Sequence, residues 1–126
     1  MTLLLVSACG GSSDSEPEPV PEPAPCTPSF DPGILIRVTD SASGNPISCG
    51  AHAVVTAGTY SEVVDNPPSP GCSDATGLTA AFERPDTYVV TISKAGYLDF
   101  VINDVVVAAG VCHVKTVTVE ARLSSK

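Results

Sequence analysis

The chain has 126 residues, enough for one small domain, and its six Lys and Arg against fourteen Asp and Glu give a net charge of −8. This acidic balance argues against binding to nucleic acids and against electrostatic attraction to anionic lipid headgroups. The 43% hydrophobic content, rich in Val, favours a small β domain, whereas the absence of Trp argues against a stacking platform for sugars or bases.

The first residues have the character of an export signal. Residues 3–6 read LLLV, like the end of a signal-peptide apolar region, and two small residues follow them. The tetrapeptide Val6-Ser7-Ala8-Cys9 resembles the lipobox of bacterial lipoproteins, in which the Cys receives acyl chains and the chain is cut before it. The resemblance implies a partial signal peptide over residues 1–8, lipidation at Cys9 and a membrane anchor made of acyl chains. A basic start is absent from residues 1–8, so we expect the recorded start to lie inside the signal.

Residues 9–32 are predicted to be a lipid-anchored linker, a disordered tether without hydrophobic periodicity. Gly10 after the Cys, where an Asp would indicate retention at the inner membrane, favours the outer membrane by the same resemblance. From Pro17 to Pro25 every second residue is proline, which predicts a semi-rigid polyproline-II spacer. A Pro-rich ligand for the groove of a partner is the alternative interpretation.

The pattern changes to alternation of apolar and polar residues from Gly33 onward. ILIRVTD places Ile34, Ile36 and Val38 on one face, and DSASGNP is a turn. Further strands are predicted up to Ala57, around residues 60–64, in LTAAFE as an edge strand, in TYVVTISKAGY, in LDFVINDVVVAAG and in VCHVKTVTVEARL. The segment DNPPSPGCSDATG is predicted to be a long loop because its prolines do not suit a central strand.

These elements predict an all-β, seven-stranded Greek-key β-sandwich over residues 33–124. In the strongest strand, Tyr88, Val90 and Ile92 are expected to face inward. In the last strand, Val114 lies out of phase with the apolar residues from Val117 onward, which predicts a β-bulge near Lys115 and Thr116.

The folded part resembles the carboxypeptidase regulatory-like, or transthyretin-like, domain. VTDSASGNPISCGAHAVV, ERPDTYVVTISKAGY and VVVAAGVCHVKTVTVEARL carry the resemblance. Gly96 and Tyr97 are expected to bend the chain and cap the core, with the tyrosine ring inside and its hydroxyl at the rim. In metallocarboxypeptidases the corresponding domain is an accessory without catalytic residues.

Four cysteines remain after Cys9: Cys26, Cys49, Cys72 and Cys112. An even number in an exported chain predicts two disulfides, for which three connectivities exist. The resemblance implies parallel first and last strands, which would bring Cys26 to Cys112 and leave Cys49 to pair with Cys72.

The sequence also contains residues that could serve other chemistry. Cys49, His52, Cys112 and His113 form a zinc-compatible set, but disulfides are favoured for the cysteines. The pairs Asp99 with Asp104 and Glu62 with Asp65 are interpreted as solvated loop charges rather than a glycosidase dyad. We therefore expect no catalytic residue, metal or cofactor.

The predicted protein is a non-catalytic, lipid-anchored surface or periplasmic module of the bacterial cell envelope. Adhesion, scaffolding or binding to a protein or glycan partner would be its role, and the oligomeric state is left open. The alternatives are an accessory subunit of a surface peptidase or transporter, by analogy, and a small hydrolase. The hydrolase hypothesis requires a concave pocket that holds His52 or His113 beside a carboxylate.

Overall fold

The computed structural model describes residues 26–126 of the chain. The predicted signal peptide, the predicted lipidation site Cys9 and the linker up to residue 25 lie outside these residues. Within the described part, no helix is long and apolar enough to cross a membrane.

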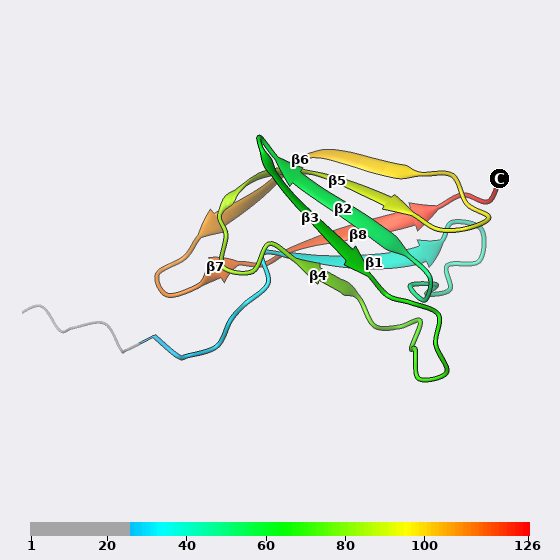
Figure 1. Cartoon of the computed structure of the whole chain (residues 1–126), viewed down its shortest axis with the longest axis horizontal. Coiled ribbons are helices and arrows are strands. Elements are labelled where there is room, and N and C mark those ends of the chain that lie inside the picture. The colour runs from blue at the N-terminus through cyan, green and yellow to red at the C-terminus, as the bar shows by residue number, and fades with distance from the viewer. Residues whose placement is uncertain (1–25) are drawn as a thin grey trace, which may run out of the picture.

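The domain is all-β, as predicted, and its strands form two sheets (Figure 1). The smaller sheet has the order β4-β1-β8, and the larger has the order β3-β2-β5-β6-β7. The strands are β1 (Ile34–Asp40), β2 (His52–Ala57), β3 (Tyr60–Asp65), β4 (Leu78–Ala80), β5 (Asp86–Ser93), β6 (Phe100–Ala109), β7 (Val114–Lys115) and β8 (Val117–Leu123).

The core lies between the two sheets and follows the predicted alternation. From β1, Ile34, Ile36 and Val38 are at most 2% exposed. From β5, the buried residues are Tyr88, Val90 and Ile92, which face the first set from the larger sheet. Burial of these apolar side chains is the main stabilising contribution to the fold.

The structure has eight strands rather than the expected seven, because the last predicted strand is divided into β7 and β8. These two strands belong to different sheets. Val114 pairs with Ala109 in the larger sheet, whereas Val117 pairs with Ile34 in the smaller one. The change at Thr116 in which alternate residues face the core is therefore not a bulge within one strand. It marks the point where the chain leaves one sheet and enters the other, so both valines can face the core.

A register shift does occur elsewhere, between β5 and β6. Tyr88 lies opposite Val105, but Val90 lies opposite Ile102, so β6 contains one additional residue. Asp104 in this stretch has a φ of 57°, the left-handed backbone that such irregularities use.

The first and last strands, β1 and β8, run parallel and in register from Ile34 opposite Val117 to Asp40 opposite Leu123. This arrangement is the one that the family resemblance implied. Because both strands run the same way, their starting points lie together at one end of the domain, close to where residues 26–33 enter (Figure 1).

The two ends of the domain differ in the segments that they contain (Figure 1). We call one the tether end, formed by residues 26–33, 81–86 and 110–116. The opposite one is the loop end, formed by residues 41–51, 66–77 and 94–99, and it includes the long Pro-rich loop that the sequence predicted.

Tyr97 at the loop end behaves as expected from the sequence. Its ring packs against the core, and its hydroxyl donates a hydrogen bond of 2.7 Å to Oδ2 of Asp40. The neighbouring Gly96 has a φ of 87°, a left-handed conformation that glycine adopts without steric cost.

Candidate functional site

Both histidines lie beside a carboxylate, but in different parts of the domain. His52 on β2 lies opposite Asp65 on β3, and its Nδ1 is 2.5 Å from Oδ1 of Asp65. His113 lies at the tether end, with its Nδ1 2.5 Å from Oε2 of Glu83. The His113–Glu83 pair is the less exposed of the two, at 18% and 23% of the side-chain surfaces against 44% and 57%.

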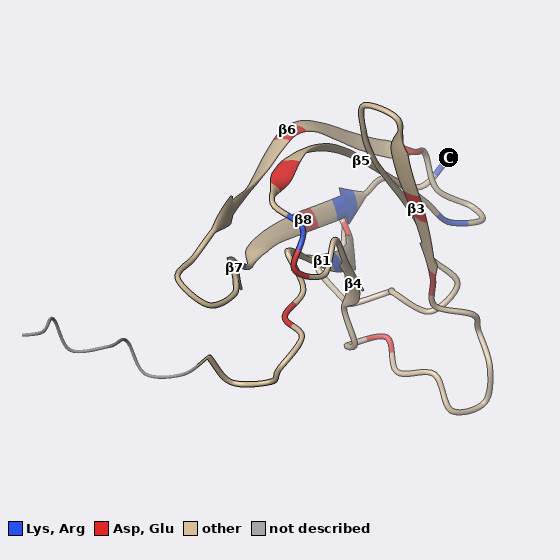
Figure 2. Cartoon of the chain, turned by 60° about the vertical axis from the view of Figure 1, so that its left-hand side comes forward, with Lys and Arg blue, Asp and Glu red and all other residues tan. Residues whose placement is uncertain are grey.

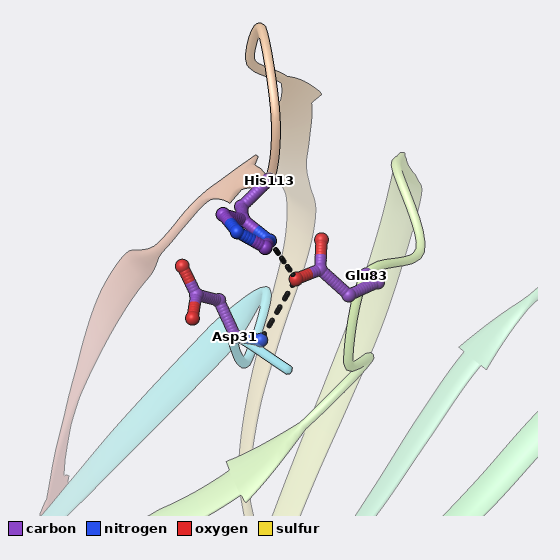
Figure 3. Close-up of side chains that lie close together, drawn as sticks. All are labelled: Asp31, Glu83 and His113. Carbon is purple, nitrogen blue, oxygen red and sulfur yellow. Dashed lines mark hydrogen bonds and ion pairs between the residues drawn. The ribbon is translucent and has the colours of Figure 1, made fainter. Parts of the chain in front are cut away.

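The tether end brings together Asp31, Glu83 and His113 from three separate segments (Figure 3). Oε2 of Glu83 accepts a hydrogen bond of 2.8 Å from the backbone N–H of Asp31. Oε1 of the same carboxylate accepts one of 3.1 Å from the backbone N–H of Val114. The Glu83 carboxylate thus links the segment that precedes β1 to the start of β7.

The opposite ring nitrogen of His113 also has partners. Its Nε2 lies 3.0 Å from Oγ1 of Thr27 and 3.3 Å from Oγ of Ser29. The imidazole is therefore held between the Glu83 carboxylate and hydroxyls of residues that precede the domain's first strand.

A left-handed turn positions Glu83. Ala81 and Glu83 have φ values of 56° and 50°, which are uncommon for residues other than glycine and persist where the surroundings enforce them. The carbonyl of Ala81 accepts a hydrogen bond of 3.0 Å from Gly33 N–H, and a Cβ at Gly33 would lie 2.6 Å from that oxygen. The close approach of these two segments therefore requires glycine at position 33.

The contacts of Glu83 and His113 favour the ionised forms of both. Hydrogen bonding from the backbone of Asp31, with smaller contributions from His113 and Val114, lowers the pKa of Glu83. The hydrogen bond to Glu83 raises the pKa of His113 above its ordinary value. The two side chains form an ion pair when the histidine is protonated.

The cysteines are paired at opposite ends of the domain. Cys26 is bonded to Cys112 at the tether end, with a Cα–Cα distance of 5.2 Å. Cys49 is bonded to Cys72 at the loop end, with a Cα–Cα distance of 6.1 Å. This is the pairing that the resemblance implied, and it leaves Cys49 and Cys112 without the thiolates that the alternative zinc set requires.

Three of the four candidate acids lie on strands rather than in loops, and one of these three is also partly buried. Glu62 is not a solvated loop charge but a half-buried residue of β3. Its Oε1 accepts hydrogen bonds from the Tyr60 hydroxyl at 2.7 Å and from the Ala81 N–H at 3.0 Å. The bond to Glu62 raises the pKa of Tyr60 to about 12, and the contact with Ala81 supports the turn that carries Glu83.

The other three candidate acids are exposed, as expected, although two of them lie on strands. Asp65 is on β3, where it pairs with His52 across the β2–β3 ladder. Asp104 is an exposed residue of β6, and Asp99 immediately precedes that strand, also exposed.

Two surface cavities of about 290 Å³ each occur on the described domain. One is lined by Arg37, Val38, Thr39, Pro46, Asp74, Ala75, Thr76, Gly77 and Glu120. The other is lined by Gly50, Ala51, Asp65, Asn66, Pro67 and Pro68. Neither lining includes His52 or His113, so neither is the histidine pocket that the hydrolase hypothesis requires.

The tether-end cluster nevertheless has chemical capacity. Glu83, His113 and Thr27 follow the carboxylate–imidazole–hydroxyl order of an acyl-transfer triad, which also needs a cavity to hold a substrate. With Asp31 added, the same residues present one imidazole and two carboxylates, a donor set that suits a divalent metal.

Sequence reasoning considered His113 but missed Asp31 and Glu83. The signal that could have found Asp31 was the disulfide implied between Cys26 and Cys112, because it brings residues just after Cys26 next to His113. Glu83 carries no such signal, since its position depends on the left-handed turn and on contacts with backbone N–H groups.

No protein-family model matches the sequence, and no curated protein matches it. The likeness to the carboxypeptidase regulatory-like domain therefore stays a prediction from the residues quoted above.

Proposed function

We propose that this protein is a non-catalytic module of the bacterial cell envelope, anchored through acyl chains on Cys9, with the outer membrane as the favoured site. The folded domain would be a carboxypeptidase regulatory-like, transthyretin-like β-sandwich that binds an envelope partner. The observation that carries the proposal is the presence of two disulfides in a domain of about 100 residues. Such crosslinks form and persist in oxidising compartments outside the cytosol.

The position of the two ends supports a display role. The chain from the predicted anchor enters at the tether end, where Cys26 is bonded to Cys112. The loops of the loop end lie at the opposite side of the domain (Figure 1). A partner that approaches the envelope from outside would thus meet the loop end first.

The charge distribution suits a partner that tolerates an acidic surface. Figure 2 shows acidic residues on the strands and loops of both ends, while Lys and Arg are few. Such a surface repels anionic headgroups, which keeps the domain in solvent above the membrane to which the acyl chains attach.

To test the anchor, the basic N-terminal segment of a lipoprotein signal peptide is added before the chain, with Val6–Cys9 retained. The protein is then expressed in a bacterium. We expect the wild-type product to partition into detergent and to show the mass of an acylated N-terminal Cys, whereas C9S stays in the aqueous phase. An unmodified Cys9 in water-soluble wild-type protein would overturn the anchor.

The binding face is tested by photo-crosslinking in intact cells. A photoreactive amino acid at Ser69 in the loop end is expected to give a defined crosslinked product, and the same group at Val111 in the tether end serves as the matched position. Crosslinks at Val111 alone would contradict the assignment of the loop end as the binding face.

A further inference from the structure

We propose that Asp31, Glu83 and His113 form a binding site for a divalent cation of the zinc class, at the point where the chain enters the domain (Figure 3). The inference does not depend on the lipid anchor. It rests on the identity of the donor atoms, on the charge of the cluster and on the contacts that orient His113 and Glu83.

The donor set selects the class of cation. Each of the three residues offers one ligand atom, and these atoms lie within 4.8 Å of one another. An imidazole nitrogen with carboxylate oxygens suits zinc and similar transition metals, whereas magnesium and calcium are bound through oxygen alone.

The charge of the cluster is incompletely balanced. Among residues 26–126, Glu83 forms an ion pair only with His113, and Asp31 forms none. The Asp31 carboxylate lies beside the His113 ring (Figure 3), and its side chain has no hydrogen-bond partner in the described part of the chain. Two carboxylates thus face a single imidazole, and a divalent cation would neutralise both.

His113 and Glu83 are oriented by hydrogen bonds to neighbouring groups, as metal ligands commonly are. Thr27 and Ser29 hold the Nε2 side of His113, which leaves Nδ1 to face the Glu83 carboxylate. Backbone N–H groups of Asp31 and Val114 hold the Glu83 carboxylate.

Binding of the cation at Nδ1 replaces the proton of the His113–Glu83 hydrogen bond. Nδ1 and Oε2 are 2.5 Å apart in the hydrogen-bonded pair. Ligand atoms around a tetrahedral zinc lie about 3.3 Å apart, as follows from zinc–ligand bonds of about 2 Å. The ring and the carboxylate therefore have to separate slightly, which changes of side-chain torsion permit because both groups are partly exposed.

His52 provides a matched control within the same chain. Its Nδ1 also lies 2.5 Å from a carboxylate, that of Asp65, yet no third His, Cys, Asp or Glu ligand joins this pair among the described residues. If a single His–carboxylate pair were sufficient, both sites would bind the cation equally.

Zinc chloride titrated into the oxidised full chain tests the proposal by calorimetry. All variants carry C9S, because a free thiolate binds zinc itself. We expect one ion per chain, loss of this binding in H113A, and unchanged binding in H52A. In D31N, which keeps the backbone N–H bonded to Glu83, we expect an affinity at least about tenfold lower, since removal of even an outer-shell partner costs 10–100-fold.

A second measurement detects binding at His113 without substituting it, so that misfolding of H113A cannot be mistaken for loss of the site. In the C9S chain, zinc is expected to shift the imidazole NMR signals of His113 and to leave those of His52 in place. The proposal is overturned if the C9S chain binds no zinc at roughly millimolar concentration. It is equally overturned if H113A and D31N bind as the C9S parent does, or if the His52 signals shift instead.

Discussion

The tether end and the loop end are each closed by one disulfide and by one side chain that joins several segments, but the chemistry of that side chain differs. At the tether end the joining group is the Glu83 carboxylate, paired with His113. At the loop end it is the neutral hydroxyl of Ser48, which is 1% exposed. The stability of a charged junction depends on pH and on cations, whereas the stability of a neutral junction does not.

The loop end shows how a neutral group can fasten a long loop. The Ser48 hydroxyl donates a hydrogen bond of 2.6 Å to the carbonyl of Thr76 and accepts one of 3.1 Å from the side-chain amide of Asn66. The backbone N–H of Cys49 donates to the carboxylate of Asp74 at 2.9 Å. The start and the end of the Pro-rich loop are thereby held to the segment before β2, independently of the tether end.

Removal of each disulfide is expected to have the largest effect on stability, with a different loss at each end of the domain. Cys26 and Cys112 are separated by 86 positions, and Cys49 and Cys72 by 23. The chain-entropy relation gives losses of about 4.6 kcal/mol for C26S/C112S and about 3.4 kcal/mol for C49S/C72S. Urea denaturation of the two double variants measures both values, and a larger loss at the loop end would contradict this expectation.

Substitution of Ser48 by Ala has the next largest expected effect. It leaves the Thr76 carbonyl and the Asn66 amide without their buried partner, which costs about 1–3 kcal/mol in the free energy of unfolding. S69A, at an exposed position of the same end whose hydroxyl makes no hydrogen bond among the described residues, is the matched control and should change stability by less than about 0.5 kcal/mol. Equal stability of S48A and S69A would show that the Ser48 hydroxyl does not fasten the loop.

The smallest expected effect is a change in how stability depends on pH. The contribution of His113, whose pKa is raised, is full below its ordinary value of 6.5 and is lost as the pH rises through the raised value. The contribution of Glu83, whose pKa is lowered, is present above its ordinary value of 4.5 and is lost as the pH falls through the lowered value. Both contributions are therefore complete between pH 4.5 and pH 6.5, where the tether end is most stable.

Unfolding free energies measured from acidic to mildly alkaline pH test this expectation, without added metal. H113Q should remove the decline that begins above pH 6.5, because it removes the titrating group. S48A should be less stable at every pH but keep that decline. A decline that persists unchanged in H113Q would assign it to another group.

Much of the fold could be predicted because the alternation of Ile34, Ile36 and Val38, and of Tyr88, Val90 and Ile92, specifies which side of a strand is buried. The change of parity after Val114 was detected but misinterpreted. Alternation reports that a side chain changes face, and it does not distinguish a bulge within one sheet from a crossing into another.

The tether-end cluster was only partly predictable. His113 could be singled out as one of two histidines, and the Cys26–Cys112 bond followed from the implied parallel strands. Glu83 could not be found, because ERPD reads as an ordinary turn. Its role depends on backbone N–H groups from distant segments, which have no signature in the sequence.

The parallel ladder of β1 and β8 has a mechanical consequence when combined with the bond from Cys26 to Cys112. That bond joins the chain just before β1 to the chain just before β7 and β8. A force applied to the preceding chain thus reaches both strands at the same end and along the same direction. The two strands are pulled as one unit, so tension does not peel the seven residue pairs of their ladder apart one after another.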